Sequence, residues 1–392
     1  MTSTIGIGII GMGWMGAVHG RAYRQIRQRF PDSGLVPELV ICADDVAARC
    51  EEARDTLGFI RITTDWREVM DDPDVSVVNI TAPNRLHLDM VRAAAAAGKH
   101  IFCEKPVGRN PEETAEIART AAEAGVLTWV GYNYRWAPLV QHTRSLVGDG
   151  ALGDITHYRG RFFAGYANHP DGVLSWRFRK EDAGSGAMGD LMSHVADMAH
   201  MLAGPLRRVI GQQALFVKDR PVAPAGEAPA GEGTHFSVGT GGKREPVTNE
   251  DYAGALVEFE NGARGTFEVG RVIQGTHCQM AFEIHGTKGA ARWDFERMNE
   301  LQLYTVDGPQ EGYVTLQSGP AYPGHGHFNP GPALGLGYDD LKVLETYHFL
   351  RSIAEGTQGE PGFNEARAVA EVLAAVERSW ASDRWELVQK IG

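Results

Sequence analysis

The chain has 392 residues, more than a single hydrophobic core usually supports, so we expect two domains. Its 43% hydrophobic and 22% charged residues are ordinary for a water-soluble globular protein. A formal charge of −12 argues against nucleic acid and against an anionic membrane surface as partners.

The sequence carries none of the usual signals for export or membrane insertion. No apolar run approaches the roughly 20 residues that span a bilayer, and the N-terminus has no basic region of the signal-peptide type. The four cysteines are scattered and lack metal-type spacing: Cys42, Cys50, Cys103 and Cys278. These features predict a cytoplasmic protein with reduced thiols.

The first predicted element is a buried strand over residues 5–10, which leads into Gly11-Met12-Gly13-Trp14-Met15-Gly16 and a helix over residues 17–29. A G-x-G-x-x-G motif is weak evidence alone, but between a strand and a helix it stands in the required context. Its glycines permit a tight turn and the close approach of a pyrophosphate, whose charge the helix N-terminus meets. The alternative is a glycine-rich turn that binds nothing.

The second strand, residues 38–43, ends in Asp44-Asp45. A carboxylate at this position suits the two hydroxyls of an NAD ribose and repels the additional phosphate of NADP. No arginine follows immediately, although Arg49 lies about a turn into the next helix. The pattern favours NAD over NADP.

Strands continue to alternate with helices up to residue 131, which predicts a doubly wound parallel sheet of the Rossmann type. In such a sheet, ligands bind beyond the carboxyl ends of the strands. Polar side chains fall at or just after these ends, and they are Asp44, Thr81, Asn84, His87, Glu104, Lys105, Asn133 and Arg135.

The strand over residues 100–103 runs directly into Glu104-Lys105-Pro106. A proline after the lysine restricts the local backbone, so the ammonium group is aimed in one direction. Taken alone the pair reads as a surface Glu-Lys pair, but its place at the edge of a nucleotide-binding sheet favours a catalytic lysine.

In the second half, the sequence predicts a helix over residues 190–202 that carries Asp190, His194 and Asp197 on one face. A carboxylate one turn from a histidine can hold its tautomer and raise its basicity, as a general base requires. The alternative is an N-capping aspartate with a buried, hydrogen-bonded histidine. Asp197 could equally be a structural acceptor.

The remaining elements predict an open, mainly antiparallel sheet followed by two helices, residues 339–355 and 364–382. A free face of this sheet suggests a homo-oligomer. His325 and His327 have no acidic or cysteine ligands nearby, so we expect no metal. The expected units are a nucleotide-binding domain (1–135), a substrate-binding and oligomerisation domain (136–337), and C-terminal helices (338–392) that pack across both.

Four motifs occur together in order: Gly11-x-Gly13-x-x-Gly16, Thr81-Ala-Pro-Asn84-x-x-His87, Glu104-Lys105-Pro106, and Gly186-x-x-Gly189-Asp190-x-x-x-His194-x-x-Asp197. With them the chain resembles the glucose–fructose oxidoreductase/inositol dehydrogenase/MocA family over essentially its full length. The resemblance implies a Rossmann domain joined to an α/β domain with an open antiparallel sheet, through which a dimer or tetramer forms.

The resemblance also implies roles for individual residues. Lys105, Asp190 and His194 would be the catalytic set. The NAD site would comprise Gly11, Gly13, Trp14, Met15, Gly16, Asp44, Thr81, Ala82, Pro83, Asn84, His87, Glu104, Lys105 and Asn133. His194, oriented by Asp190, would take the proton of a carbinol, and Lys105 would stabilise the oxygen while nicotinamide takes the hydride.

The segment from Asp171 to Lys180 resembles the levoglucosan- and glycoside-oxidising branch of the family. Trp176 offers a face for a pyranose ring, and Arg177 could reach the substrate. Arg179 and Lys180, with Arg135 and Arg161, either form an anion pocket or are solvated basic residues on loops. Substrate-binding candidates are Lys105, Arg135, Trp176, Arg177, Arg179, Asp190 and His194.

Two enzymatic functions fit these residues. The first is an NAD-dependent dehydrogenase that oxidises a secondary ring hydroxyl, at carbon 3, of a sugar or glycoside. The second is an NAD-dependent glycosidase that oxidises carbon 3 transiently, eliminates the aglycone and re-reduces the ketone, on an acidic or sulfonated sugar such as a sulfoquinovoside. A non-catalytic NAD-binding protein is a third class, which the intact Lys105, Asp190 and His194 disfavour.

Overall fold

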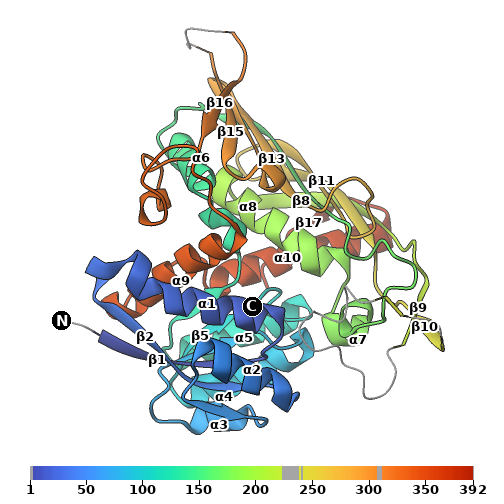
Figure 1. Cartoon of the computed structure of the whole chain (residues 1–392). Coiled ribbons are helices and arrows are strands. Elements are labelled where there is room, and N and C mark those ends of the chain that lie inside the picture. Colours follow the sequence, from blue (N-terminus) through green and yellow to red (C-terminus); the bar gives the residue numbers. More distant parts are fainter. Residues whose placement is uncertain (1–2, 223–237, 240–241, 307–310, 392) are drawn as a thin grey trace.

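The structure, a computed structural model, describes residues 3–222, 238–239, 242–306 and 311–391. It contains two large sheets with a layer of helices between them (Figure 1). Because residues 223–237, 240–241 and 307–310 are not described, the expected second domain, residues 136–337, lies partly outside the described residues.

The N-terminal sheet has six parallel strands in the order β3-β2-β1-β4-β5-β6. This order reverses direction at β1, as in a doubly wound Rossmann fold, and it confirms the predicted class. The strands are β1 (Ser3–Ile10), β2 (Leu35–Ala43), β3 (Arg61–Thr63), β4 (Val77–Ile80), β5 (His100–Cys103) and β6 (Thr128–Val130).

Apolar runs explain the central strands of this sheet. Ile7 and Ile9 in β1 are fully buried. Val77 and Val78 in β4 and Ile101 in β5 are also fully buried. Strands that are covered on both faces require continuous rather than alternating hydrophobic residues. The intervening helices are α1 (Trp14–Arg29), α2 (Ala47–Leu57), α3 (Arg67–Asp71), α4 (His87–Ala96) and α5 (Pro111–Glu123).

The second sheet has nine strands in the order β16-β15-β14-β13-β7-β12-β11-β8-β17. Only β7 and β12 pair in parallel, so the sheet is mainly antiparallel as predicted. Its strands are β7 (Ile155–Ala164), β8 (Leu206–Ala214), β11 (Tyr252–Phe259), β12 (Arg264–Gly270), β13 (Cys278–Gly286), β14 (Gly289–Asp294), β15 (Glu300–Thr305), β16 (Val314–Gln317) and β17 (Glu386–Leu387). A separate two-stranded ribbon joins β9 (Asp219–Pro221) to β10 (Arg244–Pro246).

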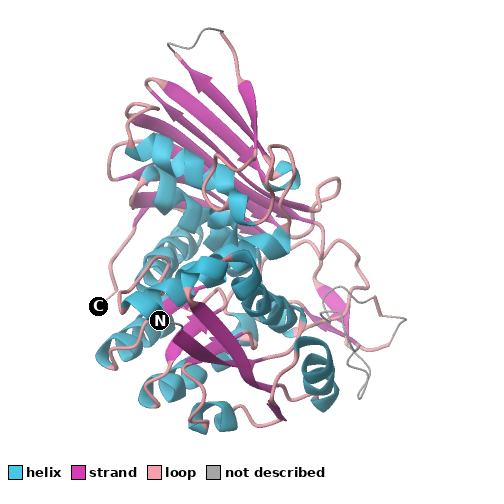
Figure 2. Ribbon diagram, turned by 60° about the vertical axis from the view of Figure 1, so that its left-hand side comes forward, coloured by secondary structure: helices cyan, strands magenta, loops and turns pink. Residues whose placement is uncertain are grey.

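Helices cover one face of the nine-stranded sheet and leave the other face open (Figure 2). The covering helices are α6 (Pro138–Gly148), α8 (Ser193–Ala203) and α10 (Phe363–Ser382). Helix α9 (Tyr338–Glu355) packs on α1, and α10 contacts both α5 and β8. The two C-terminal helices thus touch elements of both sheets.

The structure differs from the sequence-based expectation at the helix that was to begin at Asp190. A π-helical turn occupies Met188–Met192, and the α-helix α8 starts only at Ser193. A π-helical turn holds more residues than an α-helical one, so the expected common face of Asp190 and His194 is altered.

Two findings on the described residues bear on metal binding and on membrane insertion. His325 lies in a short 3₁₀ turn (His325–His327) and its Nε2 contacts the Leu334 carbonyl at 2.8 Å. Within the described ranges, no group of three or more His, Cys, Asp or Glu side chains is arranged to hold a metal ion. None of the described helices has both the length and the hydropathy needed to cross a bilayer.

Candidate active site

The glycine-rich turn has a shape that side chains would obstruct. Gly11 has φ +93°, and a Cβ there would lie 2.9 Å from the backbone of Thr81 and Ala82. A Cβ at Gly16 would lie 2.0 Å from the Gly11 carbonyl oxygen, whereas one at Gly13 would meet nothing within 4 Å. Gly13 is the N-cap of α1 and no side chain caps this helix. The open N-terminus fits the pyrophosphate of a dinucleotide.

Asp44 follows β2 and ties the end of this strand to the glycine-rich turn. Its carboxylate accepts hydrogen bonds from the backbone N–H of Met12 (2.7 Å) and of Val46 (2.9 Å). Arg49 Nη1 lies 3.3 Å from the same carboxylate. Asp44 is therefore fixed beside the turn, where an NAD ribose would bind, and Arg49 is already paired with it.

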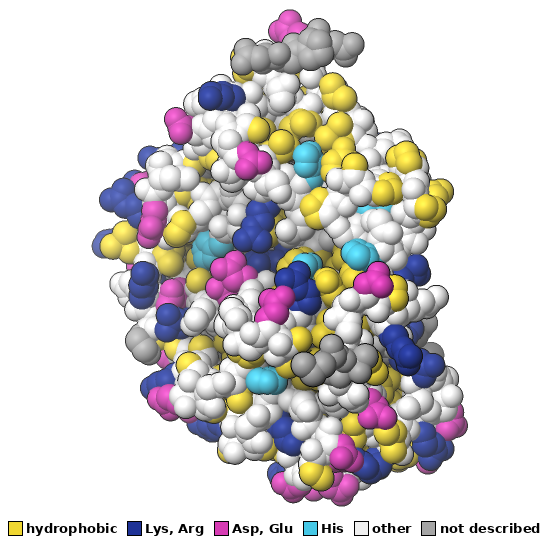
Figure 3. All heavy atoms as spheres, turned by 90° about the vertical axis from the view of Figure 1, so that its left-hand side faces the viewer, with side chains coloured by type: hydrophobic (Ala, Val, Ile, Leu, Met, Phe, Trp, Pro, Cys, Tyr) yellow, Lys and Arg dark blue, Asp and Glu magenta, His cyan; other side chains and the backbone are white. Residues whose placement is uncertain are grey.

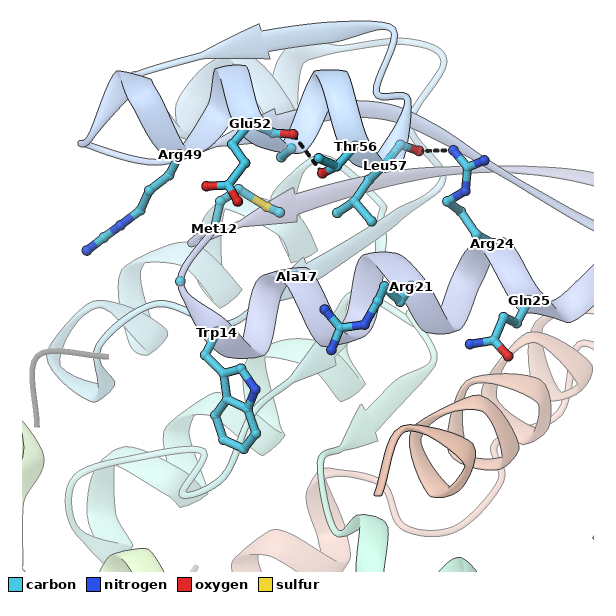
Figure 4. Close-up of a pocket in the computed structure, with 12 residues that line it drawn as sticks. Met12, Trp14, Ala17, Arg21, Arg24, Gln25, Arg49, Glu52, Thr56 and Leu57 are labelled. Atoms are coloured by element: carbon cyan, nitrogen blue, oxygen red, sulfur yellow. Dashed lines mark hydrogen bonds between the residues drawn. The ribbon is translucent and has the colours of Figure 1, made fainter. Parts of the chain in front are cut away.

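A pocket of about 510 Å³ opens between α1 and α2 beside this turn (Figure 4). Trp14, Ala17 and Arg21 line it from α1, and Arg49 and Glu52 line it from α2. The pocket borders the nucleotide turn but its lining does not include Lys105. It is thus at the nucleotide side of the candidate site.

The segment after β4 connects the nucleotide turn to the lysine loop. Thr81 Oγ1 donates to the Gly11 carbonyl at 2.5 Å. His87 is buried, with Nε2 2.8 Å from the Ala82 carbonyl and Nδ1 3.1 Å from that of Pro106. Asn84 donates to the Ala183 carbonyl at 3.0 Å. His87 and Asn84, both expected to line the NAD site, bond to the protein backbone and fix these loops, and Pro83 precedes Asn84 in the same turn.

Glu104 lies beneath the surface. Its Oε1 contacts His19 Nε2 at 2.8 Å and Lys342 Nζ at 2.6 Å. Burial by itself would raise the pKa of Glu104, but Lys342 and His19 hold that pKa well below its ordinary value. The structure thus places Glu104 in a buried ion network with α9, behind the site that it was expected to line.

Lys105 and Asp190 meet between the two halves of the chain. Lys105 Nζ lies 2.7 Å from Asp190 Oδ1 and donates to the Asp190 carbonyl at 2.8 Å. Tyr166 donates to Asp190 Oδ2 at 2.7 Å. Burial would raise the pKa of Asp190, but the charges of Lys105 and Arg177 hold it well below its ordinary value. Asp190 is a carboxylate whose two oxygens serve different donors.

His194 is buried close to this pair, with 5% of its surface exposed. Its ring packs edge-on against Tyr132 and Tyr134, with centroids 5.6 and 4.8 Å away. Burial, and then the charge of Lys105, lowers the pKa of His194 well below its ordinary value. A lowered pKa favours the neutral imidazole over the imidazolium.

The expected hydrogen bond from the His194 ring to Asp190 does not appear among the described residues. Asp190 turns to Lys105 and Tyr166, and Asp197 bonds to Arg135. The π-helical turn accounts for this separation, since it breaks the four-residue alignment of an α-helix. The prediction that Asp190 orients His194 is therefore not supported by the contacts, which assign Asp190 to Lys105.

Arg135 was expected to bind substrate and does not have the freedom to do so. Only 3% of it is exposed, and its Nε lies 3.0 Å from Asp197 Oδ2, with Nη2 bonded to the other oxygen. Arg179 is also occupied, because its Nη2 lies 2.7 Å from Glu245 Oε2. The basic residues proposed for an anion pocket thus have carboxylate partners of their own, as Arg161 and Lys180 also do.

Arg177, which was expected to reach the substrate, differs from these four residues. Its guanidinium stacks on Trp176 at 4.4 Å and has no hydrogen bond or ion pair to any described residue. Its carbonyl accepts bonds from Asn249 Nδ2 (2.9 Å) and Arg271 Nη1 (3.2 Å). Arg271 in turn is bonded to Asp251 in the interior. The backbone of Arg177 is anchored while its charge stays available to a ligand near Asp190.

Two polar residues complete the site. Asn133, which follows β6, is 2% exposed and its Nδ2 has no hydrogen-bond partner among the described residues. A donor of this kind fits a polar group of a bound nucleotide. Tyr166, which the sequence analysis did not identify, lies just after β7 without any motif around it.

Figure 3 shows acidic, basic and histidine side chains along the middle of one face, between the upper and lower parts of the molecule.

A Rossmann sheet with an open glycine-rich helix start, and a lysine that meets a second-domain aspartate, define a two-domain dinucleotide-dependent oxidoreductase. Two family models match the chain: "Oxidoreductase family, NAD-binding Rossmann fold" over residues 5–132 and "GFO/IDH/MocA C-terminal domain" over residues 140–292. The chain belongs to the GFO/IDH/MocA oxidoreductase family, and its cofactor is NAD.

Similar proteins cover the whole chain. Levoglucosan dehydrogenase of Pseudarthrobacter phenanthrenivorans is 36% identical over 389 residues, 99% of each chain. A solved levoglucosan dehydrogenase in complex with NADH and levoglucosan has a TM-score of 0.91 at 35% identity, with 98% of this chain and 100% of that chain covered. An NAD-binding oxidoreductase from Klebsiella pneumoniae has a TM-score of 0.89 at 36% identity, with 99% and 100% covered.

Proposed function

We propose that the protein is an NAD-dependent dehydrogenase that oxidises a secondary ring hydroxyl, at carbon 3, of a neutral sugar or glycoside. The observation that carries this proposal is the contact of Lys105 with Asp190, near the buried His194. The full-length similarity to levoglucosan dehydrogenase supports a sugar as the substrate class.

Each residue of the site has a separate role in the proposed reaction. When bound, NAD supplies the acceptor for the hydride. His194 accepts the hydroxyl proton as the carbinol C–H bond breaks, so that a ketone forms. The Lys105 ammonium donates to the reacting oxygen and stabilises its developing negative charge. Asp190 holds Lys105 in place through the 2.7 Å contact.

The catalytic set is tested by Lys105→Met and His194→Asn. Each variant loses a proton-transfer or charge-stabilising group, so we expect turnover to fall by about two orders of magnitude or more. NADH binding, followed by tryptophan fluorescence, should survive in both. A turnover close to that of the unmodified enzyme in either variant would contradict the assignment.

A transient-oxidation glycosidase would use the same residues. Its suggested acidic or sulfonated substrates receive less support, because all four basic residues expected to form the anion pocket already hold carboxylates. A paired assay separates the two functions. Net NADH release from a free sugar marks the dehydrogenase, whereas release of nitrophenol from a nitrophenyl glycoside with no net NADH marks the glycosidase.

We further propose that residues 1–135 bind NAD, that 136–337 bind the sugar and form the oligomer contact, and that 338–392 join the two. Helices cover only one face of the nine-stranded sheet, so the opposite face is free for a second copy of the chain. This arrangement supports the proposed division. The expected assembly is a dimer or tetramer.

A further inference from the structure

One residue from another part of the chain binds the start of the turn that carries Asp190. Glu250 stands two positions before β11 and is 8% exposed. Its Oε1 accepts hydrogen bonds from the backbone N–H of Gly186 (2.8 Å) and of Met188 (2.9 Å). Its carbonyl accepts a third, from the N–H of Ala187 at 2.9 Å. The first N–H groups of a helix have no partner within the helix, and Glu250 supplies acceptors to three successive N–H groups at this start.

Gly186 permits the close approach of the two segments. A Cβ at this position would lie 2.0 Å from the carbonyl oxygen of Glu250, so a larger residue would force the segments apart. Gly186 is the first residue of the sequence motif that also contains Asp190 and His194. Its contact with Glu250 gives a physical reason for a glycine at this place.

An unbroken series of hydrogen bonds joins Glu250 to Lys105. The carbonyl of Gly186, whose N–H is bound by Glu250, accepts from the backbone N–H of Asp190 at 3.0 Å. Lys105 Nζ then donates both to the Asp190 carbonyl (2.8 Å) and to Asp190 Oδ1 (2.7 Å). Because Lys105 binds the backbone of the turn as well as its side chain, the position of the turn sets the position of the ammonium group.

The segment that carries Glu250 is itself fixed on both sides. Asn249 Nδ2 donates to the Ser185 carbonyl at 3.1 Å, and Asn249 Oδ1 accepts from Arg271 Nη2 at 2.8 Å. Asp251 is fully buried, and its Oδ1 accepts from Arg271 Nε at 2.8 Å. The neighbours of Glu250 are thus tied to the same buried guanidinium, and Glu250 holds the turn from a fixed position.

We propose that Glu250 is a positioning residue, which fixes the turn of Asp190 so that Lys105 meets the reacting hydroxyl of the sugar. The inference rests on the proposed role of Lys105 in the oxidation. Small errors of position at a reacting centre lower turnover strongly, so the acceptors of Glu250 affect kcat although they act through Asp190.

The test compares two substitutions of similar size. Glu250→Gln keeps a carbonyl oxygen that can accept both N–H bonds, whereas Glu250→Met has no such acceptor. We expect kcat to fall about tenfold or more in Glu250→Met, with the KM for NAD unchanged. Glu250→Gln should keep most of the turnover. Equal losses in the two variants, or no loss in either, would overturn the proposal.

A third variant serves if Glu250→Met does not fold. Glu250→Asp keeps the negative charge but shortens the side chain, which draws the acceptor away from Gly186 and Met188. We expect kcat to fall in Glu250→Asp as well, because the position of the acceptor and not the charge holds the turn. Full turnover in Glu250→Asp would contradict the proposal.

Glu371→Met is the matched control. Glu371 in α10 is 6% exposed, and its Oε1 accepts from the backbone N–H of Ile391 at 2.9 Å. Its substitution removes a similar buried acceptor from a different segment, so stability should fall while kcat stays unchanged. A fall in kcat equal to that of Glu250→Met would reduce the role of Glu250 to general stability and overturn the proposal.

A readout without turnover separates this inference from the proposed function. Trinitrobenzenesulfonate modifies lysine amines, and peptide mass spectrometry of the full-length chain follows the rate at Lys105. The rate should rise in Glu250→Met and not in Glu250→Gln, because a displaced Asp190 no longer holds and covers the ammonium group. An unchanged rate in Glu250→Met refutes the inference. An unmodified enzyme that oxidises no sugar, with faster labelling of Lys105 in Glu250→Met, refutes the proposed function instead and supports the link between Glu250 and Lys105.

Discussion

At the scale of single residues, Asp44 has a structural role, and we propose that it also recognises the nucleotide. It accepts two backbone N–H groups and holds Arg49, so its carboxylate is fixed before any ligand arrives. A preorganised acceptor loses little entropy on binding ribose hydroxyls. We expect the same negative charge to repel the 2′-phosphate of NADP, and kinetics with both nucleotides can measure the two effects.

We predict that Asp44→Ala raises the KM for NAD about tenfold or more and narrows the preference for NAD over NADP, since Arg49 is then free to meet a phosphate. Steady-state kinetics with both nucleotides measure the change. Asp55→Ala, which removes an exposed acid of the neighbouring helix α2, is the control. A preference for NAD that survives in Asp44→Ala would show that another group discriminates between the nucleotides.

Among the basic residues expected to bind substrate or to form the anion pocket, Arg177 has a guanidinium with no hydrogen bond or ion pair to a described residue. Because charged hydrogen bonds to a sugar are worth about 1.5–3 kcal/mol each, we predict that Arg177→Gln raises the KM for the sugar about tenfold or more. The NAD KM should be unchanged. Arg179→Gln, whose side chain is already paired with Glu245, should bind the sugar normally. Equal effects of the two substitutions would exclude Arg177 as a substrate ligand.

At the scale of elements, the sequence predicted the features of the fold that local sequence patterns determine. The glycine turn, the alternating strands and helices, and the polar strand ends all follow from short-range rules. The π-helical turn at Met188–Met192 does not follow from such rules, and its Asp190 contacts Lys105 and Tyr166 from other parts of the chain. Lys342 looked like an ordinary helix residue for the same reason.

The three acids and bases of the predicted helix face illustrate this limit. Spacing placed Asp190, His194 and Asp197 together, but each has its own environment in the folded chain. The basic residues of the second domain show it too. Their number suggested an anion pocket, while the carboxylates that neutralise Arg135 and Arg179 lie 62 and 66 positions away in sequence.

The Arg135–Asp197 pair joins the segment after β6 to α8 and gives an element-scale prediction. Both side chains are nearly inaccessible to solvent, with 4% and 3% exposed. Asp197→Ala leaves a buried guanidinium without its partner, so we expect the free energy of unfolding to fall by about 3–5 kcal/mol. Urea denaturation measures it. Glu116→Ala, which breaks the exposed pair with Arg92, should cost less than about 1 kcal/mol.

At the scale of the whole molecule, the open face of the nine-stranded sheet differs from a simple apolar surface. Leu256 in β11 is 53% exposed, while its neighbours Ala255 and Val257 point to the covering helices. Nearby on the sheet, Glu258 binds Arg207 and Arg208 through 2.9 and 2.7 Å contacts. A partner for this face must therefore match both an apolar side chain and paired charges.

We propose a second copy of the chain as this partner, because a two-fold interface sets the same patch against itself. We predict that light scattering gives a dimer or tetramer mass, and that Leu256→Asp shifts the assembly towards the monomer at low micromolar concentration, since it introduces an unpaired charge into a contact. Ile60→Asp is the matched control, because Ile60 is equally exposed, at 57%, on the Rossmann half. A monomer mass for the unmodified protein would contradict the proposed interface, and so would equal dissociation in both variants.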